Sequence, residues 1–196
     1  MWKRLLLALA VAWGIYSWWS QRPVQLGPGV VAAQPPQQEL LGAAPSFEHN
    51  GYRITPLAEY DIEARLLASE HYRLGREADL SPLDFGVGWG RMSDEAVLKQ
   101  IEISQANRFM YWRVEQFPIP QREIEISASN MHLIPADKNI ERQLDKMRVG
   151  QLVHLRGRLV RADAPDGWRW ISSLSREDTG AGACELFWVE QASALN

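Results

Sequence analysis

His132, with Asn130 two residues before it, has the character of a general base held in place by a neighbouring amide. A histidine that is oriented by an asparagine or a carboxylate can activate a serine hydroxyl or a cysteine thiol for nucleophilic attack. Ser173 and Cys184 are the candidate nucleophiles, so these residues predict a hydrolase or transferase as one possible function. In the competing interpretation, His132 only satisfies backbone groups at the end of a strand before Pro135.

Cys184 is the only cysteine of the 196 residues, so no disulfide can form within the chain. It is followed by Glu185 and an apolar stretch, whereas reactive cysteines need electropositive surroundings. Cysteine is also among the most frequently buried residue types. The sequence therefore favours a small core residue at position 184, and no G-x-S-x-G motif supports a serine nucleophile elsewhere.

Trp168 and Trp170 fall on the same face of one expected strand and could stack against a sugar or a peptide. With Asn130 and Asp178 they form the candidate ligand-binding set. Because indoles also fill cores, the pattern favours a core position for the two tryptophans.

The sequence predicts neither a metal nor a cofactor. Its four histidines lack the i, i+4 spacing of a metal site, and the glycines at positions 86, 88 and 90 do not match a phosphate-binding loop.

The soluble part reads as an α+β domain. Alternation from Tyr60 to Leu66, over 123–129 and over 151–160 predicts strands. Short helices are expected after Ser93 and over 137–147, which gives two. Together these patterns predict a mainly antiparallel β-sheet or a small, partly open barrel whose ending is oligonucleotide/oligosaccharide-binding-like.

Residues 1–22 are typical of an uncleaved signal anchor, and a cleaved secretory signal is the main alternative. Lys3 and Arg4 precede an uncharged run from Leu5 to Tyr16, and tryptophans at both ends fit an aromatic belt. We therefore expect an N-terminal transmembrane helix, a single-pass inner-membrane location, a cytoplasmic N-terminus and a periplasmic domain. A linker rich in Pro, Gly, Gln and Ala is expected over 23–45, and the soluble β-rich domain over 46–191.

Beyond Arg22 the chain has 18 Lys and Arg against 24 Asp and Glu. This negative balance gives no general attraction for nucleic acid, so none is expected as a partner. A membrane tether without a catalytic signature favours a non-catalytic binding or assembly module for a protein or envelope ligand. The hydrolase or transferase that uses His132 with Ser173 or Cys184 is the alternative.

Three segments carry a resemblance to a group of short membrane-anchored bacterial proteins of unassigned function. They are Pro82–Asp94, Ser127–Ala136 and Asp166–Glu185. The resemblance covers most of the soluble domain and implies an envelope protein of the Gram-negative type. It implies no activity and no catalytic residue.

Overall fold

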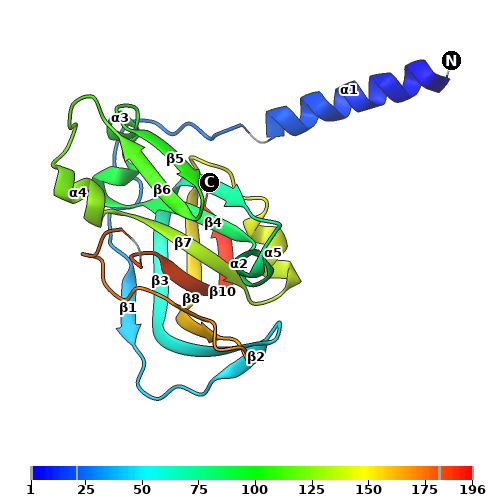
Figure 1. The fold of residues 1–196 in the computed structure, drawn as a ribbon. Coiled ribbons are helices and arrows are strands. Elements are labelled where there is room, and N and C mark those ends of the chain that lie inside the picture. The colour runs from blue at the N-terminus through cyan, green and yellow to red at the C-terminus, as the bar shows by residue number, and fades with distance from the viewer. Residues whose placement is uncertain (1, 21, 181, 196) are drawn as a thin grey trace.

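The computed structural model describes residues 2–20, 22–180 and 182–195, and β-strands dominate this part of the chain (Figure 1). Among these residues, eight strands form one sheet: β1 (Gln37–Leu40), β2 (Phe47–His49), β3 (Tyr52–His71), β4 (Leu83–Gly88), β7 (Ala128–Pro135), β8 (Leu152–Asp163), β9 (Arg169–Ile171) and β10 (Glu185–Ala194). A separate hairpin consists of β5 (Glu102–Ala106) and β6 (Phe109–Arg113). The helices are α1 (Trp2–Ser20), α2 (Arg76–Leu80), the 3₁₀ helix η1 (Gly90–Ser93), α3 (Glu95–Leu98), α4 (Gln121–Ile126) and α5 (Lys138–Leu144).

Five strands of the large sheet close on themselves. The order β3–β4–β7–β10–β8 returns to β3, which pairs with both β4 and β8. Of these five pairings, only β7 with β10 is parallel. The 20-residue strand β3 can bend around the core because its pairing register shifts twice, between Pro56 and Ala58 and between Leu66 and Ala68.

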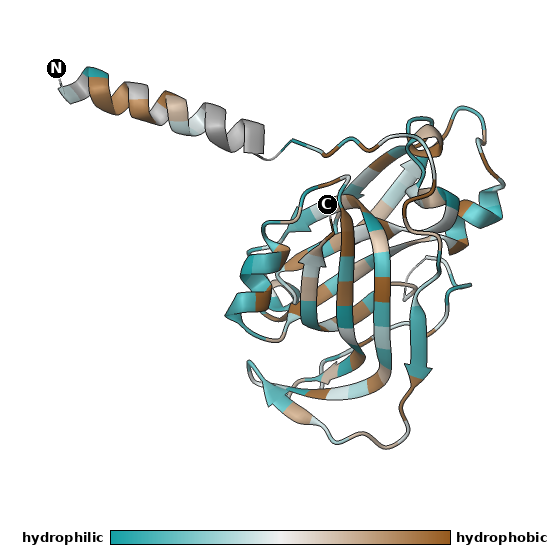
Figure 2. Cartoon of the chain, turned by 180° about the vertical axis from the view of Figure 1, so that it is seen from behind, coloured by the Kyte–Doolittle hydropathy of each residue, from teal (hydrophilic) through white to brown (hydrophobic). Residues whose placement is uncertain are grey.

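The main core lies inside this closed sheet. In β3, the alternating residues Tyr60, Ile62, Ala64 and Leu66 are buried, as the sequence pattern predicts. Figure 2 shows hydrophobic and polar residues alternating along the long strands. In β4, Gly88 allows a close approach of backbone, because a Cβ there would lie 2.4 Å from the carbonyl oxygen of Met92.

Residues 23–45 contact the sheet at several points. The Val24 amide donates to the Val149 carbonyl at 2.7 Å, and the Gly90 amide donates to the Ala32 carbonyl at the same distance. Ala32 is buried in the main core, and β1 pairs with β3. The segment that composition suggests is a linker therefore supplies a core residue and a strand.

The structure confirms a β-rich domain and corrects the predicted fold class. The sheet of eight strands is mixed, because β7 pairs with β10 in parallel while its other pairings are antiparallel, and it closes on itself. More than two short helices accompany it within the described ranges. Alternation within single strands shows neither how many strands join a sheet nor whether neighbours run parallel, so the sequence could not indicate the parallel β7–β10 pair.

The predicted transmembrane helix and single-pass inner-membrane location were also wrong. Within the described residues, no helix combines the length and apolar character needed to cross a membrane. The uncharged run extends from Leu5 to Gln21, but only its first 12 residues, Leu5–Tyr16, precede the serines and paired tryptophans, which is short of the ~20 apolar residues that a span requires. The prediction counted the serines and tryptophans after Tyr16 as part of the span and so overestimated its apolar length.

Candidate active site

Strand pairing brings Cys184 to the two polar residues of β7. Asn130 and His132 are two residues apart in β7, so their side chains lie on the same face. Cys184 immediately precedes β10, whose Leu186 is in register with His132. The Asn130 amide Nδ2 donates to the Cys184 sulfur at 3.5 Å, and the Cys184 thiol donates to the Arg108 carbonyl at 4.0 Å. Cys184 also lies close enough to His132 to raise the pKa of the imidazole.

Asp84 completes this arrangement from the other side of His132. It is the cross-strand neighbour of His132 in β4, and its side chain is fully buried. Its Oδ1 atom lies 3.0 Å from His132 Nδ1. This distance is short enough for a hydrogen bond. However, neither His132 Nδ1 nor Asp84 Oδ2 has a well-aligned hydrogen-bond partner among the described residues. The contact between His132 and Asp84 is therefore mainly electrostatic.

His132 is held in its charged form. Burial by itself lowers the pKa of the imidazole, but the Asp84 carboxylate and the Cys184 sulfur raise it to about 9. The Trp170 ring lies against the imidazole, with centroids 4.7 Å apart. At neutral pH His132 is therefore an imidazolium close to Cys184.

Arg108 connects the β5–β6 hairpin to Asp84. It occupies the two-residue turn with Asn107, and both have a positive φ, 52° for Asn107 and 70° for Arg108. Arg108 Nη1 donates to Asp84 Oδ1 at 2.7 Å and to the Ser81 carbonyl at 2.9 Å. Its guanidinium carbon lies 3.7 Å from the centroid of the Tyr72 ring. The same carboxylate oxygen therefore faces two cations.

The Arg108 backbone also orients Asn130. Its carbonyl accepts a hydrogen bond from Asn130 Nδ2 at 2.9 Å, while Asn130 Oδ1 accepts one from Gln105 Nε2 at 2.5 Å. These contacts fix which end of the Asn130 amide faces the sulfur. The donor end is directed toward Cys184.

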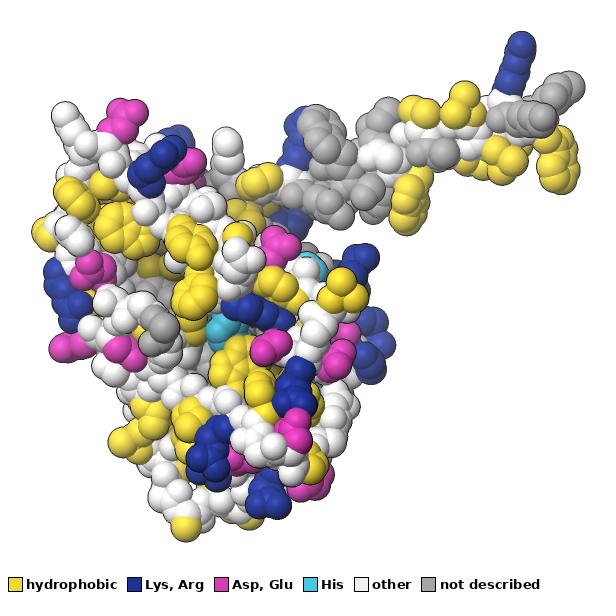
Figure 3. All heavy atoms as spheres, in the orientation of Figure 1, with side chains coloured by type: hydrophobic (Ala, Val, Ile, Leu, Met, Phe, Trp, Pro, Cys, Tyr) yellow, Lys and Arg dark blue, Asp and Glu magenta, His cyan; other side chains and the backbone are white. Residues whose placement is uncertain are grey.

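Cys184 and Asn130 line a cavity of about 350 Å³. Side chains of β6, including Phe109 and Tyr111, form another part of its wall. In the space-filling view, hydrophobic side chains gather on the face that carries β6 (Figure 3). The sulfur thus has access to a space that can hold a small molecule.

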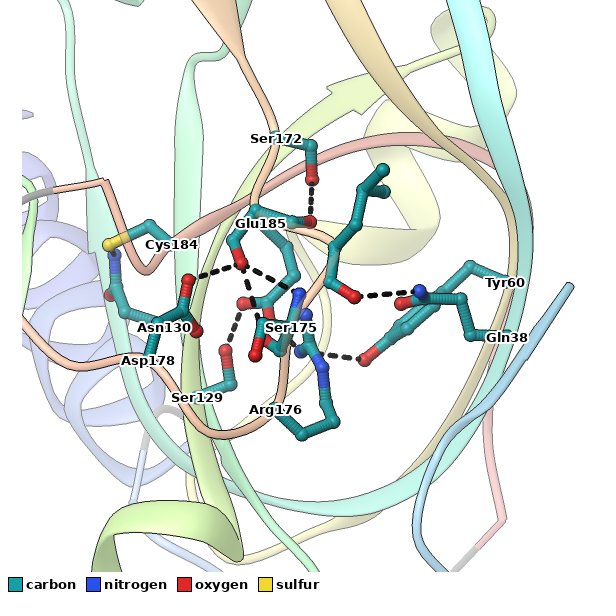
Figure 4. A network of polar contacts seen from close by, with 12 residues as sticks. Gln38, Tyr60, Ser129, Asn130, Ser172, Ser175, Arg176, Asp178, Cys184 and Glu185 are labelled. Atoms are coloured by element: carbon teal, nitrogen blue, oxygen red, sulfur yellow. Dashed lines mark hydrogen bonds and ion pairs between the residues drawn. The ribbon is translucent and has the colours of Figure 1, made fainter. Parts of the chain in front are cut away.

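A buried charged network supports the floor of this cavity (Figure 4). Glu185 is 1% exposed and accepts hydrogen bonds from Arg176 and Ser129. Arg176 Nη1 also donates to the Tyr60 hydroxyl at 3.3 Å. Burial raises the pKa of Tyr60 to about 12, against the lowering effect of Arg176, so Tyr60 remains neutral. The network thereby holds the first residue of β10, next to Cys184.

Ser173 and Asp178, two further predicted site residues, contact each other. Ser173 Oγ donates to Asp178 at 2.6 Å and accepts the Ser175 amide at 3.0 Å. This geometry is that of a turn, which engages the hydroxyl locally. Asp178 nevertheless lines the same cavity as Cys184. Of the two predicted nucleophiles, Cys184 is the one that lies close enough to His132 to raise its pKa.

Trp168 and Trp170 do not form an open platform. Both are partly buried and pack against a second core cluster. Their rings meet at 70° with centroids 6.0 Å apart, and Trp168 also contacts Tyr52. Trp170 instead covers His132, so one of these residues contributes to the site as a wall.

Sequence reasoning missed Asp84 and Arg108. Asp84 is a carboxylate between the buried residues Leu83 and Phe85, and such a position signals a partnered charge. Arg108 carried no comparable signal, since its role depends on how the hairpin folds over the sheet. In the described part of the chain, no group of three or more His, Cys, Asp or Glu side chains is arranged to hold a metal ion.

No protein-family model, curated protein or solved structure matches the chain in the three comparisons made. The resemblance to short membrane-anchored bacterial proteins therefore stays a prediction.

Proposed function

We propose that the protein is a thiol-dependent acyltransferase or hydrolase, with Cys184 as nucleophile and His132 as proton carrier. The observation that carries this proposal is the arrangement around His132. Its Nδ1 atom lies 3.0 Å from buried Asp84, and Cys184, which lines the cavity with Asn130, is close enough to affect the pKa of the imidazole. A nucleophile, a base and a third group that orients the base are the recurring parts of nucleophilic catalysis.

In the first step, the Cys184 thiolate attacks the carbonyl carbon of an acyl donor. The Asn130 Nδ2 hydrogen that points at the sulfur would turn to the oxygen that becomes negative, while the other stays on the Arg108 carbonyl. The bond between the carbonyl carbon and the leaving group breaks, and the His132 imidazolium gives its proton to the leaving group. The product is a thioester on Cys184.

In the second step, water or another acceptor attacks the thioester carbon, and neutral His132 takes the proton of the acceptor. The carbon–sulfur bond breaks, and the thiolate and imidazolium are restored. Asp84 carries the counter-charge for the imidazolium throughout. Arg108 fixes the Asp84 carboxylate and is a positioning residue.

The non-catalytic binding module, which the sequence favours, rests on the lack of a catalytic motif. A triad is recognised by geometry rather than by sequence order, so the lack of a motif is weak evidence once these contacts are known. Both the binding module and the thiol enzyme are compatible with an envelope ligand or a protein partner.

Trapping the acyl intermediate tests the proposal. The full chain is mixed with p-nitrophenyl acetate and its mass is measured after rapid acid quenching. We expect a burst of nitrophenol and an acetyl adduct on Cys184. Cys184→Ala should abolish both, whereas Ser173→Ala should retain them. An adduct that persists in Cys184→Ala, or no adduct in the wild type, would contradict the proposal.

A further inference from the structure

The wall of the Cys184 cavity is mainly aromatic and aliphatic on the side of the hairpin. Phe109, Tyr111 and Trp112 come from β6, Trp89 follows β4, and Ile124 comes from α4. Phe109 and Tyr111 are 37% and 49% exposed. These apolar surfaces remain available to a ligand, which would remove them from water.

The carboxylates in the same wall have partners within the protein. Glu185 is paired with Arg176, and Asp178 accepts the Ser173 hydroxyl. Glu125 lies 3.5 Å from Arg122. A charged group on a substrate would therefore have to compete with contacts that already exist.

Arg176 is the cation of this wall, and it has limited capacity for a further anion. Its Nη1 atom is occupied by Glu185 and Tyr60. Its Nε and Nη2 atoms have no hydrogen-bond partner among the described residues, but both are shielded from solvent. A carboxylate in the cavity could reach them only after a rearrangement of the wall.

We propose, as an extension that rests on the function proposed above, that the acyl donor carries an uncharged, apolar acyl group of medium length. The acyl chain would lie against Phe109 and Tyr111, with its carbonyl carbon at Cys184. A volume of about 350 Å³ is at the lower end of small-molecule sites, so the cavity fits one acyl chain or one aryl group.

The test is a series of p-nitrophenyl esters with acetyl, butyryl, hexanoyl, octanoyl and dodecanoyl groups, assayed with the full chain. Each methylene that becomes buried should raise kcat/KM by up to about fourfold, until the cavity is filled. A hexanoyl ester with a terminal carboxylate should react at least about tenfold more slowly than the hexanoyl ester itself.

Two variants separate the cavity from general surface effects. Tyr111→Ser should reduce the ratio of octanoyl to acetyl kcat/KM by about tenfold. Leu74→Ser removes another exposed apolar side chain, which is 92% exposed and lies outside the cavity wall, and should leave that ratio unchanged. If Tyr111→Ser fails to fold, Phe109→Ser provides the same comparison.

The outcomes distinguish this inference from the function on which it rests. If the acetyl ester acylates Cys184 but kcat/KM is flat or falls with chain length, the acyl preference is wrong and the thiol mechanism stands. A faster reaction of the carboxylate-bearing ester would likewise overturn the acyl preference. If no ester of the series acylates Cys184, both proposals are wrong.

Discussion

At the scale of single residues, the charge of His132 is linked to the stability of the fold. The imidazole is 5% exposed, and its pKa rises from an ordinary 6.5 to about 9 despite the opposing effect of burial. Because the folded pKa is the higher one, His132 stabilises the protein fully below pH 6.5. That stabilisation is lost as the pH rises through about 9.

We therefore expect the free energy of unfolding to fall by up to about 3 kcal/mol between pH 6.5 and pH 9.5. Urea unfolding at a series of pH values measures this quantity. His132→Gln should show a much smaller fall over the same interval. An equal fall in both proteins would assign the pH dependence to other groups.

Asp84 is the residue whose charge we expect to matter most for stability. Asp84→Asn leaves Arg108 and His132, two largely buried cations, without their shared carboxylate. Breaking such a buried pair should cost about 3–5 kcal/mol of unfolding free energy. The Asp145→Asn variant disrupts the exposed His71–Asp145 contact and should cost less than about 1 kcal/mol. Similar losses in the two variants would contradict the buried role of Asp84.

At the scale of elements, the β5–β6 hairpin is held over the site by its turn. Arg108 adopts a left-handed conformation that is uncommon for a residue with a long side chain. Its side chain and backbone contact Asp84 and Asn130, which belong to two different strands of the large sheet. The hairpin should therefore loosen when these contacts are removed.

Arg108→Gln tests this link by hydrogen exchange of the amides over 102–113. We expect exchange in the hairpin to become at least about tenfold faster while the closed sheet keeps its protection. Arg113→Gln removes an exposed ion pair with Glu102 inside the same hairpin and is the matched control. Equal exchange in Arg108→Gln and in the wild type would show that the turn does not secure the hairpin.

Close packing between β4 and the turn after it depends on Gly88. A Cβ at this position would lie 2.4 Å from the Met92 carbonyl oxygen and 2.8 Å from the Leu67 side chain. Gly88→Ala should therefore lower the unfolding free energy by about 1–3 kcal/mol. Gly27→Ala, which meets no atom within 4 Å, is the control for chemical denaturation. A neutral Gly88→Ala would show that the turn can move away.

At the scale of the whole molecule, patterns among neighbouring residues predicted secondary structure, but the sequence did not indicate which distant segments pair. The alternation in β3 and the helix start at Asp137 both follow from neighbouring residues, and Asp137 does cap α5. The strand predicted over 123–129 was wrong in its first part, because the helix α4 extends to Ile126. Two isoleucines at i and i+2 are too few to distinguish the two periods.

The candidate site was predicted only in part for the same reason. His132, Asn130 and Cys184 were identified by residue type, whereas their contacts depend on the parallel pairing of β7 with β10. Asp84 and Arg108 join them from β4 and from the hairpin, which single-sequence periodicity cannot bring together. The choice between Ser173 and Cys184 required this topology.

In the proposed mechanism, His132 and Asp84 activate Cys184 toward electrophiles. Because the chain has one cysteine, the rate of iodoacetamide alkylation reports on Cys184 alone. At pH 6.5 we predict that the wild type is alkylated at least about tenfold faster than free glutathione, and that His132→Gln loses most of this advantage. A wild-type rate no faster than that of glutathione, or a rate that is unchanged in His132→Gln, would show that His132 does not activate Cys184.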